Sequence, residues 1–82
     1  MKLAVCQESS PAEDAAGALA RMRRRASAAA EAGAALVIFP EMFLTGYNIG
    51  DAVFSLAEPA DGPSAAAVES IARASYRAAT TR

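Results

Sequence analysis

The fold is decided by one stretch, Ala34-Ala35-Leu36-Val37-Ile38-Phe39-Pro40-Glu41-Met42-Phe43-Leu44-Thr45-Gly46-Tyr47. Its first six residues are all apolar, and two of them are β-branched, which is typical of a central strand covered by helices on both faces. Pro40 ends this strand, because proline has no N–H to donate to a neighbouring strand. Glu41 therefore follows a buried strand directly, and residues 45–48 read as a turn.

The residues before this stretch predict a second strand and a helix. Leu3–Cys6 is a short apolar run that we interpret as a strand buried on both faces. A helix is predicted from residue 12 to about residue 32, with Ser10 or Asp14 as its N-cap and Gly33 at its end. Its apolar face is expected to carry Ala15, Leu19, Met22, Ala26 and Ala29. Strand, helix and strand in this order predict an α/β fold built on a βαβ unit with parallel strands.

The residues after it predict one or two further helices. Ile49–Leu56 is expected to form a short helix, and residues 58–63 form a proline-containing loop. A longer helix should run from Ser64 to about Tyr76, capped by Ser64 or Asp61, with a buried stripe of Ser64, Val68, Ile71 and Ser75. Residues 74–82 contain no apolar run for the strand that an α/β fold expects next, so we predict an incomplete sheet and a divergent tail.

Composition excludes several classes of function. The 82 residues contain no histidine and one cysteine, Cys6, which removes Ser-His-Asp and Cys-His pairs, an internal disulfide and a multi-cysteine zinc site. We interpret Cys6 as a buried, inert thiol. The net charge of −1 argues against a nucleic-acid or membrane partner, and Arg21, Arg23, Arg24 and Arg25 are read as a solvated helix face rather than an RNA-binding patch. No apolar run is long enough to span a membrane, and the expected location is the cytoplasm.

Glu41 is the strongest candidate for chemistry. The carboxyl ends of parallel strands are where α/β folds place their ligands. Its neighbours Phe39, Met42, Phe43 and Leu44 would desolvate a carboxylate and make it a better proton acceptor. The residues alone leave open the alternative of a solvent-facing glutamate at a strand end.

The same stretch closely resembles the first signature of the nitrilase superfamily of carbon–nitrogen hydrolases, in which a hydrophobic strand is followed by Pro-Glu, bulky residues and Gly-Tyr. Leu3–Gln7 resembles the first strand of that family, and Asp61-Gly62-Pro63 resembles the segment after the signature. The resemblance covers about residues 2–73 of a chain that we interpret as the N-terminal part, 1–82, of one such domain.

The resemblance implies part of an α-β-β-α sandwich and a Glu-Lys-Cys catalytic set. In that set a cysteine thiolate attacks an amide or nitrile carbon, glutamate is the general base and lysine stabilises the tetrahedral intermediate, with no metal or organic cofactor. Only the glutamate carries over, onto Glu41, because the family's lysine and cysteine lie on later strands and neither Lys2 nor Cys6 matches them. Phe43 and Tyr47 are candidates to line the pocket for a small amide or nitrile, although aromatic residues at such positions are more often core.

The sequence also allows two interpretations of the chain other than that of a hydrolase. The 82-residue chain by itself is expected to be inactive, which fits a truncated or frame-shifted remnant. Alternatively it is a small interaction module that associates through an exposed sheet edge or apolar helix faces. Members of the family that the sequence resembles usually form dimers or larger assemblies, so the resemblance also allows a homo-oligomer.

Overall fold

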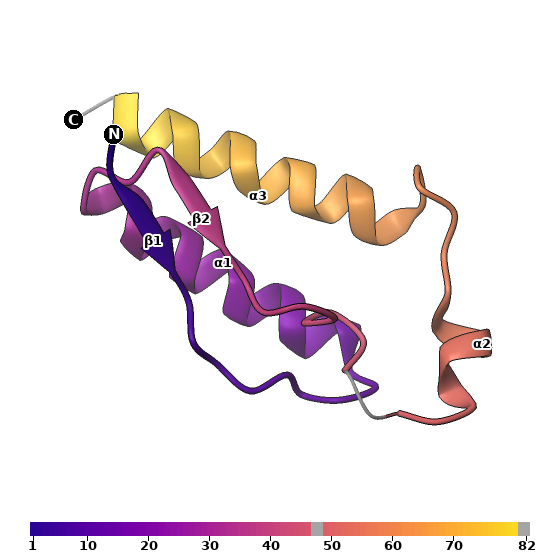
Figure 1. Cartoon of the computed structure of the whole chain (residues 1–82). Coiled ribbons are helices and arrows are strands. Elements are labelled where there is room, and N and C mark those ends of the chain that lie inside the picture. Colours follow the sequence, from indigo (N-terminus) through magenta and orange to yellow (C-terminus); the bar gives the residue numbers. More distant parts are fainter. Residues whose placement is uncertain (47–48, 81–82) are drawn as a thin grey trace.

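A computed structural model describes residues 1–46 and 49–80, with the side chains of 77–80 excepted. Along the chain the elements are β1 (Leu3–Val5), α1 (Ala15–Glu31), β2 (Leu36–Ile38), α2 (Ala52–Leu56) and α3 (Pro63–Thr80). Figure 1 shows the two strands side by side, with α1 and α3 packed together behind and beside them and α2 set apart. This architecture confirms the predicted α/β class, with its βαβ unit and two further helices.

The strands pair in parallel, in the register Leu3 with Leu36 and Val5 with Ile38. Two bonds extend the pairing beyond the strand ends. The N–H of Ala35 donates to the carbonyl of Lys2 at 2.8 Å, and the N–H of Cys6 donates to the carbonyl of Ile38 at 2.9 Å. The carboxyl ends of both strands therefore lie at the same edge of the sheet, and both Cys6 and Glu41 follow that edge in sequence.

The prediction that both strands are buried on both faces is wrong for the described chain. Val5 is 65% exposed, and Leu3, Leu36 and Ile38 are also exposed, whereas Ala4 and Val37 between them are half-buried. The cause is that α1 and α3 pack against each other on one side, and no described element covers the other side. An apolar run therefore predicted the strands correctly but not the number of faces that they bury.

Helix α1 has the N-cap Asp14 and the terminal Gly33 that the sequence indicated, although it begins at Ala15 rather than at residue 12. The Asp14 carboxylate accepts the N–H of Gly17 at 3.0 Å, which satisfies one of the free amides of the first turn. At the other end the N–H of Gly33 donates to Ala30 and that of Ala34 donates to Ala29, and Gly33 has a φ of +89°. This is a Schellman motif, which favours glycine because other residues are strained at such a φ.

The core lies where α1 faces α3. Ala18 is fully buried, and the other members of this cluster are Met22, Ala26, Phe43 and Ile71. The alanines offer little side-chain volume, so the two helices approach closely and the larger side chains fill the remaining space. The stripe predicted for α3 is confirmed, since Ser64, Val68 and Ser75 are half-buried and Ile71 is buried. That of α1 is confirmed in part: Met22 and Ala26 are buried as predicted, but Ala18 and Ala30 are buried while Ala15 and Ala29 are half-buried.

Helix α3 differs from its prediction at both ends. It extends to Thr80, beyond the expected end near Tyr76. At its start Pro63 occupies the first position, where the missing N–H costs nothing. The backbone N–H of Ser64 and its hydroxyl both bond to the carboxylate of Glu58, so the acceptor at this end is neither of the two residues that we predicted. Helix α2 is also shorter than predicted, beginning at Ala52 rather than Ile49.

Candidate active site

Glu41 lies in a tight turn at the carboxyl edge of the sheet, which we call the Glu41 turn (residues 40–46). Two bonds close this turn: the N–H of Phe43 donates to Pro40 at 3.2 Å, and that of Gly46 donates to Met42 at 2.8 Å. Met42 has a φ of +57° and Gly46 a φ of +95°, which reverses the chain within a few residues. The position expected from the sequence, directly after the strand that Pro40 ends, is therefore the position observed.

The Glu41 side chain is exposed, as is that of its neighbour Met42. The apolar surroundings that the sequence suggested are not formed by the described residues, because the side chain of Phe43 packs into the core instead. A desolvated site for this carboxylate therefore needs protein surface beyond the part of the chain that the structure describes.

The two aromatic candidates have different outcomes. Phe43 is 3% exposed and contacts Phe39, with ring centroids 5.5 Å apart and planes inclined by 34°. Phe43 is thus a core residue in this structure, as the alternative interpretation of the sequence suggested. A role for Phe43 in binding substrate stays a prediction. Tyr47 lies outside the described residues.

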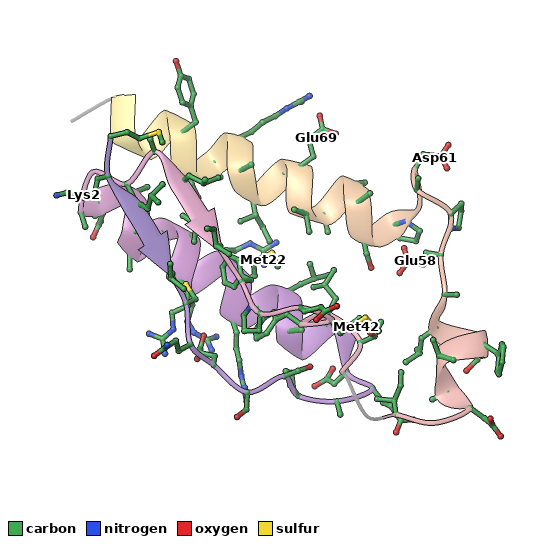
Figure 2. All side chains as sticks on the ribbon, viewed as in Figure 1. Lys2, Met22, Met42, Glu58, Asp61 and Glu69 are labelled. Atoms are coloured by element: carbon green, nitrogen blue, oxygen red, sulfur yellow. The ribbon has the colours of Figure 1, made fainter. Side chains whose placement is uncertain are left out.

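Lys2 lies at the end of the sheet opposite the Glu41 turn, whereas Cys6 lies at the same edge as this turn. Lys2 precedes β1, and its ammonium group donates to the carbonyl of Ala32 at 2.8 Å, where it complements the C-terminus of α1. Figure 2 shows Lys2 and Met42, the neighbour of Glu41, at opposite ends of the sheet. Cys6 follows β1 at the same edge as Glu41 but is half-buried, rather than buried as predicted. Lys2 therefore has a structural contact of its own and no place beside Glu41.

A groove of about 510 Å³ lies between α1, β2 and α3. Its walls are almost entirely apolar and include Met22, Val37, Phe39, Val68 and Ile71. Glu41 is not among the residues that line it, so this groove is not a site for the carboxylate's chemistry. Within residues 1–46 and 49–80 no three His, Cys, Asp or Glu side chains come together in a group that could hold a metal ion.

The segment before α1, residues 8–13, is held by the arginines of that helix, and we call it the entry loop. Arg25 contacts both carboxylate oxygens of Glu8, through Nε at 3.0 Å and Nη2 at 3.1 Å, and Arg21 donates to the carbonyl of Ser9 at 2.8 Å. The hydrogen bond from Arg25 holds the pKa of Glu8 below its ordinary value. Arg25 stays exposed, in accord with the interpretation of a solvated helix face, whereas Arg21 is half-buried. The bonds of these arginines to the entry loop were not predicted, because their partners lie far apart in the sequence.

The entry loop also contacts the Glu41 turn. The hydroxyl of Ser10 donates to the carbonyl of Phe43 at 2.7 Å, and the N–H of Glu13 donates to the carbonyl of Thr45 at 2.9 Å. These contacts join α1, the entry loop and the turn that carries Glu41. Sequence reasoning missed them, because Ser10 was considered only as a helix cap.

Comparisons with known proteins identify the family of the chain. The family model described as carbon–nitrogen hydrolase matches residues 2–77. A protein of Pseudomonas protegens (strain DSM 19095 / LMG 27888 / CFBP 6595 / CHA0) named "Hydrolase in pqqF 5'region" is 52% identical over 62 residues, which are 74% of this chain and 21% of that protein. The chain thus spans about a fifth of the length of this relative. No solved structure matches the chain.

Proposed function

Because the chain belongs to the carbon–nitrogen hydrolase family, we propose that Glu41 is the general base of an enzyme that hydrolyses non-peptide C–N bonds in small amides, nitriles or carbamoyl compounds. The observation that carries the proposal is the place of Glu41, in a closed turn at the carboxyl edge of a parallel sheet. The family match includes this turn, since it extends from residue 2 to residue 77.

For an amide substrate the proposed reaction has two halves. Glu41 accepts the proton of a cysteine thiol, the thiolate attacks the carbonyl carbon, and the C–N bond breaks as Glu41 returns that proton to the leaving nitrogen. Water then attacks the resulting thioester with Glu41 again as base, which releases the carboxylic acid and the thiol. A lysine stabilises the negative oxygen of each tetrahedral intermediate.

The cysteine and the lysine of this scheme come from elsewhere in the enzyme. Lys2 bonds to Ala32 at the far end of the sheet, and Cys6 does not match the family's nucleophile. The 82-residue chain supplies the base and its supporting turn, so we expect it to release no ammonia from amides or nitriles by itself.

A chimera tests the proposal. The matching segment of the Pseudomonas hydrolase is replaced by residues 1–77 of this chain, and hydrolysis of a panel of small amides and nitriles is measured. Activity of the chimera and a loss of about 10²- to 10⁴-fold in kcat on Glu41→Gln are expected, because positioned general bases contribute on that order. The matched control is Glu69→Gln, on the outer face of α3, which should leave kcat unchanged. An active chimera that tolerates Glu41→Gln would rule out this role for Glu41.

One observation favours a second candidate function. Leu3, Val5, Leu36 and Ile38 are neighbouring apolar side chains on the uncovered face of the sheet, and all four are exposed. Such a face favours an interaction module or a homo-oligomer, in which a partner covers it. A nucleic-acid partner has less support, because Arg21 and Arg25 already bond within the chain.

A further inference from the structure

The entry loop and the Glu41 turn are joined at three successive points. The Ser10 hydroxyl donates to the carbonyl of Phe43, and the Glu13 N–H donates to the carbonyl of Thr45. Beside these bonds the two backbones also approach closely: a Cβ on Gly46 would lie 2.9 Å from both Cα and Cβ of Ala12. Only glycine permits so close an approach at this φ, so the two segments pack as one unit.

The turn needs such support because its conformation is strained. Met42, the residue after Glu41, has a left-handed φ of +57°, which is unfavourable for a residue with a side chain. Strained backbone persists where surrounding contacts determine it, and such strain is found at functional sites. Among the described residues no side chain bonds to the Glu41 carboxylate, so its position depends on the backbone of its turn.

The entry loop is itself fixed to a rigid element. Arg21 and Arg25 hold Ser9 and Glu8 against α1, and Asp14 caps that helix directly after the loop. A continuous series of contacts thus leads from α1 through Ser10 to Phe43, two residues from Glu41. A hydroxyl that is half-buried and bonded across 33 residues of sequence is the central member of this series.

We propose that Ser10 is a positioning residue for Glu41: its hydrogen bond to Phe43 holds the Glu41 turn in the one backbone conformation that directs the carboxylate toward the thiol. The inference rests on the proposed function of Glu41. Ser10 touches neither substrate nor the reacting atoms, so its loss should lower the rate of the chemical step and leave substrate binding unchanged.

The structural part of the proposal is tested on the 82-residue chain by hydrogen exchange at the amides of Glu13 and Gly46, which bond to Thr45 and Met42. Ser10→Ala should speed exchange at both amides. Ser9→Ala is the matched control, because it removes a neighbouring hydroxyl and keeps the carbonyl that Arg21 contacts. If the chain shows no protected amides, the same segments are followed in the chimera by mass spectrometry. Equal protection in wild type and Ser10→Ala overturns the proposal, whatever the activity.

The catalytic part is tested in the chimera. Ser10→Ala should lower kcat about 10- to 100-fold with KM changed by less than about threefold, the pattern of an interaction that matters only in the transition state. Ser10→Thr, which keeps the hydroxyl, should restore kcat, and Ser9→Ala should not change it. Rates are divided by the folded fraction from near-ultraviolet circular dichroism. If Ser10→Ala does not fold, Ser10→Cys is measured instead, because its thiol is a weaker donor of similar size and should give an intermediate kcat.

The outcomes separate this inference from the proposed function. If Glu41→Gln abolishes activity while Ser10→Ala (or Ser10→Cys) retains wild-type kcat, the positioning role is wrong and the function of Glu41 stands. If Ser10→Ala raises KM as strongly as it lowers kcat, or Ser10→Thr fails to restore kcat, Ser10 does not act through its hydrogen bond and the positioning role is again refuted.

Discussion

The carboxylate of Glu58 accepts two hydrogen bonds from Ser64, one from the backbone N–H at 2.7 Å and one from the hydroxyl at 2.5 Å. Ser64 lies in the first turn of α3, whose first amides have no partner within the helix. A negative charge at this end of the helix also interacts favourably with the helix dipole. Figure 2 shows Glu58 beside the start of α3, with Asp61 on the turn next to it.

We expect Glu58→Gln to lower the thermal midpoint of unfolding at neutral pH, and Asp61→Asn to leave it unchanged. The hydrogen bonds from Ser64 hold the pKa of Glu58 below its ordinary value of 4.5. Between these two pKa values the unfolded chain binds more protons than the folded chain, so this stabilisation is complete above pH 4.5 and is lost as the pH falls through the folded-state pKa. The difference between wild type and Glu58→Gln should therefore shrink in acid. If Asp61→Asn lowers the midpoint and Glu58→Gln does not, Asp61 rather than Glu58 caps α3, as the sequence suggested.

Phe43→Ala should remove a large part of the stability of the chain. Its side chain is 3% exposed in the cluster between α1 and α3, and truncation of a buried phenylalanine costs about 3–5 kcal/mol. Phe54→Ala is the control, because this side chain is 82% exposed and should change stability by less than about 0.5 kcal/mol. Urea unfolding followed by circular dichroism measures both. Similar effects of the two changes would contradict the core that we describe.

The uncovered face of the sheet predicts self-association of the isolated chain. Val5 and Ile38 are paired neighbours on that face and are 65% and 44% exposed. Replacing both by threonine keeps the preference for strand while removing apolar surface, so sedimentation velocity should show less association at equal concentration. Val53→Thr, an apolar residue of α2 that is 40% exposed, should have little effect. A wild-type chain that stays monomeric at all concentrations would argue against the interaction module.

The local sequence was enough to predict those elements whose ends are marked by a residue that acts on its immediate neighbours. Asp14, Gly33 and Pro40 each act on their immediate neighbours, by accepting an amide, by adopting a positive φ and by withholding an N–H. Helix α1, the end of β2 and the position of Glu41 after it could therefore be predicted from the sequence. The stripe of α3 was predictable for the same reason, because helical periodicity fixes which residues share a face.

The sequence by itself determined the type and order of the strands and helices, and that a glutamate follows the second strand. Only the tertiary structure decided that the strands bury one face, that Glu58 rather than Asp61 bonds to the start of α3, and that Ser10 bonds to Phe43. The physical reason is that an apolar run indicates how strongly its residues favour burial, but not how many helices or other elements are present to cover the two faces of the strand. A bond between residues 33 positions apart depends likewise on the path of the whole chain, which no local pattern encodes.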